Sequence, residues 1–150
     1  MPVIRNTISI KAPIEVCFDL ARNVEVHLKT TKKTKEKAVG GVTSGLLEEG
    51  DIVEWEAVHF GIKQRLSSKL TEMNRPYEFK DMMVKGAFKS FIHTHTFVAS
   101  GNETVMIDHF DYLSPLGFLG KAADFLFLER YMQKFLSDRA KELKKIAETN

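Results

Sequence analysis

Two histidines and an aspartate on adjacent predicted strands are the residues best suited to chemistry in this sequence. A single residue separates His93 from His95. Asp108 lies in the next alternating segment, after a Gly101-Asn102 turn. Side chains of an extended strand alternate between its two faces, so the two imidazoles share a face. Paired strands lie about 4.8 Å apart, which makes these imidazoles the natural partners of the Asp108 carboxylate. The pattern predicts a polar cluster on a surface that is otherwise apolar and buried.

Such a cluster is compatible with several kinds of chemistry. A carboxylate inside an apolar cavity needs a partner, and an imidazolium held by Asp108 favours a ligand with an acidic or carbonyl head group. His93 or His95 with Asp108 can also serve as general acid and base for enolisation or dehydration. A polar network that only sets the strand register is a further alternative. Asp81, which is in phase with Phe79, is a second candidate carboxylate.

The spacing of His93 and His95 can also chelate a metal ion. His59 or Asp108 would complete three ligands for zinc or iron. A His-x-His pair alone is a weak signal, because imidazoles hydrogen-bonded to carboxylates satisfy the same buried groups. Cys17 is the only cysteine, which excludes a cluster of thiolate ligands. We therefore predict no metal and no cofactor.

Large apolar side chains share the strand faces of these polar groups, and we expect them to form the wall of a cavity. Ordinary packing between a sheet and a helix would use the same residue types. The predicted ligand-binding residues are Trp55, His59, Phe79, Asp81, Met83, Phe91, His93, His95, Met106, Asp108, Phe110 and Tyr112.

The rest of the pattern predicts the elements that position this surface. Residues 3–11 alternate as a half-buried strand, and short helices are expected at 13–21 and 24–28. Further strands are expected at 51–60, 62–70, 77–84, 87–99 and 103–112. Their connections are too short for crossovers, so they form antiparallel hairpins. Apolar residues at helical spacing predict a long helix over 118–147, about 45 Å in length.

Length and composition indicate a single domain over residues 1–150. A chain of 150 residues is long enough to bury about 70% of its unfolded surface. The net charge of +2 is too small to predict a nucleic-acid partner. The sequence has no signal-peptide pattern and no apolar run near the roughly 18 residues of a membrane span. We expect a cytoplasmic protein, without membrane insertion, that is a monomer or a weak homodimer.

A lysine-rich stretch over residues 29–37 carries five lysines and one glutamate. A solvated strand or loop edge is the main interpretation, because lysines discourage edge-to-edge pairing of sheets. The alternative is an interaction surface for RNA or an anionic membrane. The glycines that follow, Gly40, Gly41 and Gly45, predict a flexible loop or lid.

The order of elements and several motifs resemble the START/Bet v 1-like (SRPBCC) superfamily. Within it, the chain is similar to the polyketide cyclase/dehydrase-like, ligand-binding branch over nearly its whole length. The matching segments are His59-Phe-Gly-Ile62, Phe79-Lys-Asp81, Gly86-Ala-Phe88, His93-Thr-His-Thr-Phe97, Met106-Ile-Asp108 and Tyr112-Leu-Ser-Pro-Leu-Gly117.

This resemblance implies an α+β helix-grip fold. A curved antiparallel sheet of about seven strands would wrap around a long C-terminal helix, with two short helices after the first strand and a cavity inside. Members bind lipids, polyketides, sterols, quinones or plant hormones, and a minority catalyse cyclisation or dehydration. We therefore predict binding of a hydrophobic small molecule or lipid. The alternative is a cyclase or dehydratase that uses His93 or His95 with Asp108.

Overall fold

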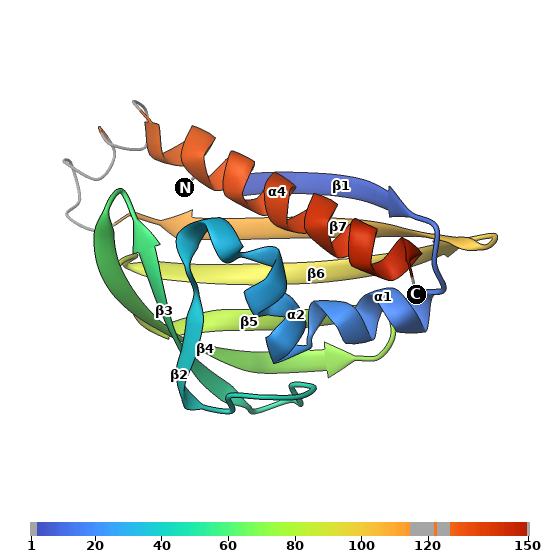
Figure 1. Ribbon diagram of the computed structural model, residues 1–150, viewed down its shortest axis with the longest axis horizontal. Coiled ribbons are helices and arrows are strands. Elements are labelled where there is room, and N and C mark those ends of the chain that lie inside the picture. The colour runs from blue at the N-terminus through green and yellow to red at the C-terminus, as the bar shows by residue number, and fades with distance from the viewer. Residues whose placement is uncertain (1–2, 115–121, 123–126, 150) are drawn as a thin grey trace.

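The computed structural model describes residues 3–114, 122 and 127–149, and its described part is an α+β structure (Figure 1). The strands are β1 (Val3–Ile10), β2 (Lys37–Gly41), β3 (Ile52–His59), β4 (Ile62–Asn74), β5 (Glu78–Lys85), β6 (Ser90–Ser100) and β7 (Glu103–Leu113). The helices are α1 (Ile14–Ala21), α2 (Val24–Thr30), the 3₁₀ turn η1 (Lys32–Thr34) and α4 (Glu129–Glu148).

All seven strands belong to one antiparallel sheet with the order β1-β7-β6-β5-β4-β3-β2. Strands β2 to β7 follow one another as hairpins, and β1 closes the series by pairing with β7. The antiparallel hairpins predicted from the short connections are confirmed. Helices α1, α2 and α4 all lie on the same face of the sheet, with α4 running diagonally across it (Figure 1).

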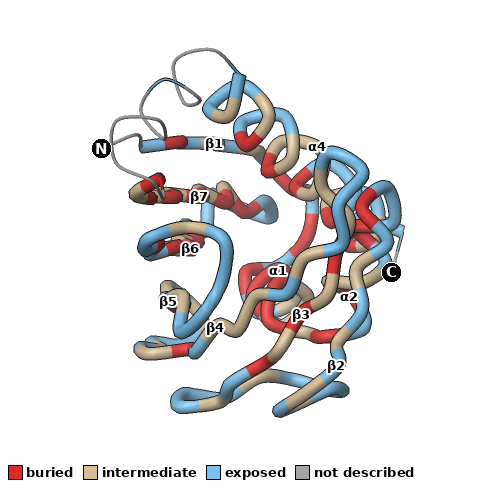
Figure 2. The backbone as a smooth tube through the Cα atoms, turned by 90° about the vertical axis from the view of Figure 1, so that its left-hand side faces the viewer, coloured by how far each residue is buried: buried red, intermediate tan, exposed pale blue. Residues whose placement is uncertain are grey.

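The sheet is strongly curved, and its inner face carries the core. Figure 2 shows the strands bending around an interior that the helices close. On β6, every second residue from Phe91 to Phe97 is buried, and on β7 the same holds from Thr104 to Tyr112. The period of two therefore predicted correctly which side chains of these strands face the interior.

The described part of the C-terminal helix covers this interior with a stripe of small and apolar residues. The buried residues of α4 are Met132, Leu136, Ala140, Leu143 and Ala147. The helix packs against β1, α1 and α2. The predicted helix over 118–147 is confirmed from Glu129 onward, while residues 115–121 and 123–126 lie outside the described residues.

Of the three glycines expected to form a flexible loop or lid, Gly40 and Gly41 belong instead to an edge strand, whereas Gly45 lies in the loop that follows it. Gly40 and Gly41 lie in β2, which pairs with β3 through a register shift between Ala38 and Gly40. Gly41 has a φ of +67°, and a Cβ atom there would lie 2.0 Å from the carbonyl oxygen of Ile52. Only glycine fits this position, so the pair forms a bulge that bends the edge of the sheet.

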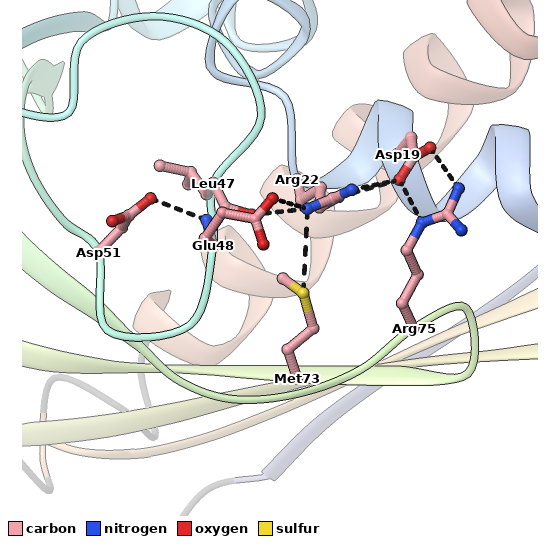
Figure 3. A network of polar contacts seen from close by, with 7 residues as sticks. All are labelled: Asp19, Arg22, Leu47, Glu48, Asp51, Met73 and Arg75. Atoms are coloured by element: carbon pink, nitrogen blue, oxygen red, sulfur yellow. Dashed lines mark hydrogen bonds and ion pairs between the residues drawn. The ribbon is translucent and has the colours of Figure 1, made fainter.

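A buried arginine joins α1, the β2–β3 loop and β4 at one end of the interior (Figure 3). Arg22 is 6% exposed, and its guanidinium donates to Asp19 at 2.9 Å and to Glu48 at 2.8 Å. It also donates to the carbonyl oxygen of Leu47 at 3.1 Å. The other side of Asp19 binds Arg75, at 2.7 Å. Arg22 thus holds together three segments that are distant in the sequence.

We predict that Arg22→Met lowers the free energy of unfolding by about 2 kcal/mol. The variant keeps an apolar stem but leaves the Leu47 carbonyl without its donor, and an unsatisfied buried acceptor costs about 1–3 kcal/mol. Arg75→Met is the matched control, because Arg75 binds the same Asp19 with a side chain 44% exposed and should cost at most about 1 kcal/mol. Urea denaturation measures both, and equal losses would contradict the assignment.

Candidate ligand cavity

A cavity of about 290 Å³ lies between the concave face of the sheet and α4. Its walls come mainly from β3, β4, β5, β6 and α4, and most of the wall is apolar. Apolar lining residues include Trp55, Leu70, Phe79, Phe91, Phe110 and Leu136.

The structure brings seven of the twelve predicted ligand-binding residues to the cavity lining. They are Trp55, His59, Phe79, Asp81, Phe91, His93 and Phe110. The other five, Met83, His95, Met106, Asp108 and Tyr112, do not line it. They face the same interior, but α1, α4 or neighbouring side chains cover them, so that Met106 packs in the α1–α4 core and Tyr112 packs against Phe88. The strand period alone does not distinguish a covered face from a hollow one.

The predicted polar cluster is a chain of four titratable groups, of which His93, His95 and Asp108 are buried and Asp81 is half-buried. Nε2 of His93 lies 2.9 Å from Oδ1 of Asp108, and Nδ1 of His95 lies 3.3 Å from the same oxygen. Nε2 of His95 lies 2.9 Å from Oδ2 of Asp81. The pairing of both imidazoles with Asp108 is confirmed, and Asp81 extends the chain by one carboxylate.

Strand register explains why these four groups meet. His95 is directly opposite Asp108 on β7, and His93 is directly opposite Asp81 on β5. The two imidazoles stack at 3.8 Å between ring centroids, and Phe79 stacks on His95 at 4.1 Å. A shift by one residue would turn all of these side chains to the other face of the sheet.

His95 carries a positive charge because both of its ring nitrogens face carboxylates. A neutral imidazole would point a lone pair at one of the two oxygens. Burial by itself would lower the pKa of His95, but Asp108 and Asp81 outweigh it and raise the pKa above its ordinary value. Burial likewise opposes ionisation of Asp108, but hydrogen bonds from His93 and His95 hold the pKa of that carboxyl far below its usual range.

His93 is the neutral member of the chain and faces the cavity. Burial lowers its pKa, and the charge on His95 lowers it further, against the opposing effect of Asp108. Since Nε2–H donates to Asp108, Nδ1 is left as an acceptor, and it has no hydrogen-bond partner among the described residues. Asp81, whose side chain is 25% exposed, brings the other end of the chain to the same cavity.

Asp81, His93 and His95 each offer one metal-ligating atom, and these atoms lie within 4.8 Å of one another. His59, one of the two residues that the sequence offered as a third ligand, lies elsewhere in the wall, where its Nδ1 is 2.5 Å from the hydroxyl of Tyr131. A cation at Asp81, His93 and His95 would have to replace the proton between His95 and Asp81. We therefore interpret the group as a hydrogen-bonded chain, which pairs three of its four imidazole nitrogens with carboxylates.

Sequence reasoning missed a second polar group in the cavity wall. His27 donates from Nε2 to Oε1 of Glu36 at 2.7 Å, and its ring stacks on Trp55 at 4.0 Å between centroids. Glu36 belongs to the lysine-rich stretch, whose five lysines are exposed as predicted. The stretch is not wholly solvated, however, because the Glu36 side chain is only 7% exposed and lines the cavity.

Arg139 is another polar lining residue that was missed, and the sequence did contain a signal for it. It lines the cavity from α4, at helical spacing from Leu136 and Leu143. A charged residue in the apolar stripe of an amphipathic helix is unusual, because burying an unpaired charge is costly. The position of Arg139 within the stripe could have marked it as a candidate binding residue.

No family model and no curated protein sequence matches the chain. Solved structures do match it. The protein TTHA0849 from Thermus thermophilus has a TM-score of 0.79 at 21% identity, covering 96% of this chain and 95% of that one. A START superfamily protein from Mycobacterium smegmatis has a TM-score of 0.76 at 14% identity over 98% and 97%. Major latex-like protein 151 from Panax ginseng has 0.73 at 15% identity over 97% of each chain.

These similarities show the fold, which is the helix-grip fold of START/Bet v 1-like proteins. The α+β class, the seven-stranded sheet, the two short helices after β1 and the C-terminal helix on the sheet are confirmed. Within the described residues, no helix is both long and apolar enough to cross a membrane.

We predict that the two stacked imidazoles titrate on opposite sides of the ordinary histidine pKa of 6.5. The charge on His95 stabilises the fold fully below pH 6.5, and this contribution is lost as the pH rises through its raised pKa. NMR of ¹³C-labelled histidines should show His95 losing its charge at a pH above 6.5 and His93 gaining its charge at a pH below 6.5. Identical titrations would contradict the charge assignment.

Proposed function

We propose that this protein binds a hydrophobic small molecule or lipid in the cavity between the sheet and α4. The observation that carries the proposal is an apolar cavity of about 290 Å³ that two polar groups border. One is the hydrogen-bonded chain, which reaches the cavity at its two ends, His93 and Asp81, and the other is the pair His27 and Glu36. Small-molecule sites combine apolar walls with a few placed polar groups in this way, and they begin at about 300 Å³. A cavity at the lower end of that range favours a compact ligand with one polar end.

The energetics support a guest in this space. Apolar surface removed from water contributes roughly 25 cal/mol per Å², and side chains that line a void lack packing partners on one side. The fold likeness points the same way, since the resemblance to START/Bet v 1-like proteins implies an internal site for hydrophobic ligands. Polyketides are among the ligands that we propose, because the sequence resembles the polyketide cyclase/dehydrase-like branch.

We expect Ala57→Phe to abolish binding by placing a ring inside the cavity. Ala57 lines the cavity on β3, whereas Val98 is 48% exposed on the outer face of β6. Val98→Phe therefore adds similar bulk outside the cavity and serves as the control. With a panel of acyl chains, quinones and aromatic polyketides, hits should raise the Tm of the wild type and of Val98→Phe only. A panel without any hit would contradict the proposed function.

A cyclase or dehydratase activity is the second candidate, and the position of His93 favours it. Nδ1 of His93 can remove a proton next to a ligand carbonyl while Asp108 orients the ring at 2.9 Å. Return of that proton to a β-hydroxyl releases water and leaves a carbon–carbon double bond. Asp108 and His95 are covered, so of the two imidazoles His93 is the one that would touch the substrate, while Asp81 also borders the cavity.

If the protein is such an enzyme, His93→Gln should lower kcat by about a hundredfold or more with nearly unchanged ligand affinity. The amide keeps a hydrogen-bonding side chain but cannot exchange protons, and general acid–base catalysis contributes about 10²–10⁴ in rate. Single-turnover kinetics on β-hydroxy ketones, with a separate binding assay, measure both quantities. A parallel loss of affinity and turnover would assign His93 to binding alone.

A further inference from the structure

Arg139 differs from the other charged residues around the cavity in its lack of a partner within residues 3–114, 122 and 127–149. Among the described residues, it makes no hydrogen bond and no ion pair, although a guanidinium offers five N–H donors. The other charged lining residues are all hydrogen-bonded or ion-paired: Arg22, Glu36, Asp51, Arg65 and Asp81. In the part of the chain that the structure describes, the cavity therefore contains one cation whose hydrogen-bonding capacity is unused.

The two carboxylates that interact electrostatically with Arg139 are already engaged. Glu36 accepts from His27 at 2.7 Å and from the Thr34 hydroxyl at 3.1 Å, and Asp81 accepts from His95 at 2.9 Å. Both carboxylates feel the charge of Arg139, but neither lies within the 4.0 Å of an ion pair. They offset part of the cost of placing the half-buried Arg139 at the cavity wall without using its donors.

We propose that the ligand is an amphipathic monocarboxylate whose head group binds Arg139 and whose apolar part lies along the wall formed by Trp55, Phe79 and Phe91. This inference rests on the proposed function and names the ligand class for the same cavity. The planar fork of a guanidinium matches a carboxylate with two parallel hydrogen bonds. A phosphate monoester would bring a second negative charge toward Glu36 and Asp81, so the site favours a single charge.

Binding of a carboxylate ligand should be accompanied by uptake of a proton at His27. Burial lowers the pKa of His27, and the charge on Arg139 lowers it further, while Glu36 and Asp81 oppose the shift. A ligand carboxylate bound to Arg139 offsets the effect of the arginine's positive charge on the pKa of His27, and it adds a negative charge nearby. His27 then takes up a proton, which the 2.7 Å contact with Glu36 stabilises. The groups facing His27 are Glu36 ahead of β2, Trp55 on β3, Asp81 on β5 and Arg139 on α4.

The test compares decanoic acid with decanol, which share an apolar chain and differ in the head group. Calorimetry at neutral pH should show the acid binding wild-type protein about ten-fold more tightly or better, as charge-assisted hydrogen bonds predict. Arg139→Met should lose this preference but still bind decanol. Arg130→Met is the matched control, because Arg130 is exposed on the same helix and its loss should leave the preference intact.

The outcomes separate the two levels of the proposal. Equal affinities for acid and alcohol would overturn the carboxylate assignment and leave cavity binding standing, whereas binding of neither probe, nor of any other hydrophobic compound, would overturn the proposed function itself. Repeating the titration in buffers of different ionisation enthalpy counts protons. Uptake of about one proton with the acid, lost in His27→Gln, supports the His27 step. Undiminished uptake in that variant would contradict it.

Discussion

The Asp108 carboxylate is buried on the inner face of the sheet, where two imidazoles share it. Much of the structure depends on this arrangement. A buried carboxylate without partners is strongly destabilising, so β6 must place His93 and His95 against it. That requirement sets the register of three strands, because a one-residue shift would turn every one of these side chains outward. The same arrangement sets the charges of the two imidazoles. His95, between Asp81 and Asp108, is held as a cation, and its neighbour His93 is held as a neutral base.

The cavity results from a mismatch between a curved sheet and the helices that cover it. Bulges in β2 and β4 bend the sheet around an interior that α4 covers along one side only. Core side chains fill the ends of this interior, and Arg22 joins α1 to the β2–β3 loop at one of them. The space left in the middle is reached by polar groups from both sides, the His93 chain from the sheet and Arg139 from α4.

The parts of the site that could be predicted share a single feature, a local period that reports orientation. Alternation on β6 and β7 identified His93, His95 and Asp108 as inward-facing, and helical spacing identified the core stripe of α4. Met106 and Tyr112 show the limit of that signal, because they face inward but lie under other side chains. His27 lies in a short helix and Glu36 in the loop before β2, and neither segment is long enough for a period to report orientation.

The sequence by itself determined the α+β class, the order of the elements apart from β2, and the inward face of each long strand, because these depend on spacing along a regular backbone. Only the tertiary structure decided which inward residues border a hollow and which lie in packed core. It also decided that His27 and Glu36, which are near each other in the chain, interact electrostatically with the distant Asp81 and Arg139 across one cavity. Those outcomes depend on sheet curvature and on the placement of α4, which arise from contacts among all layers at once.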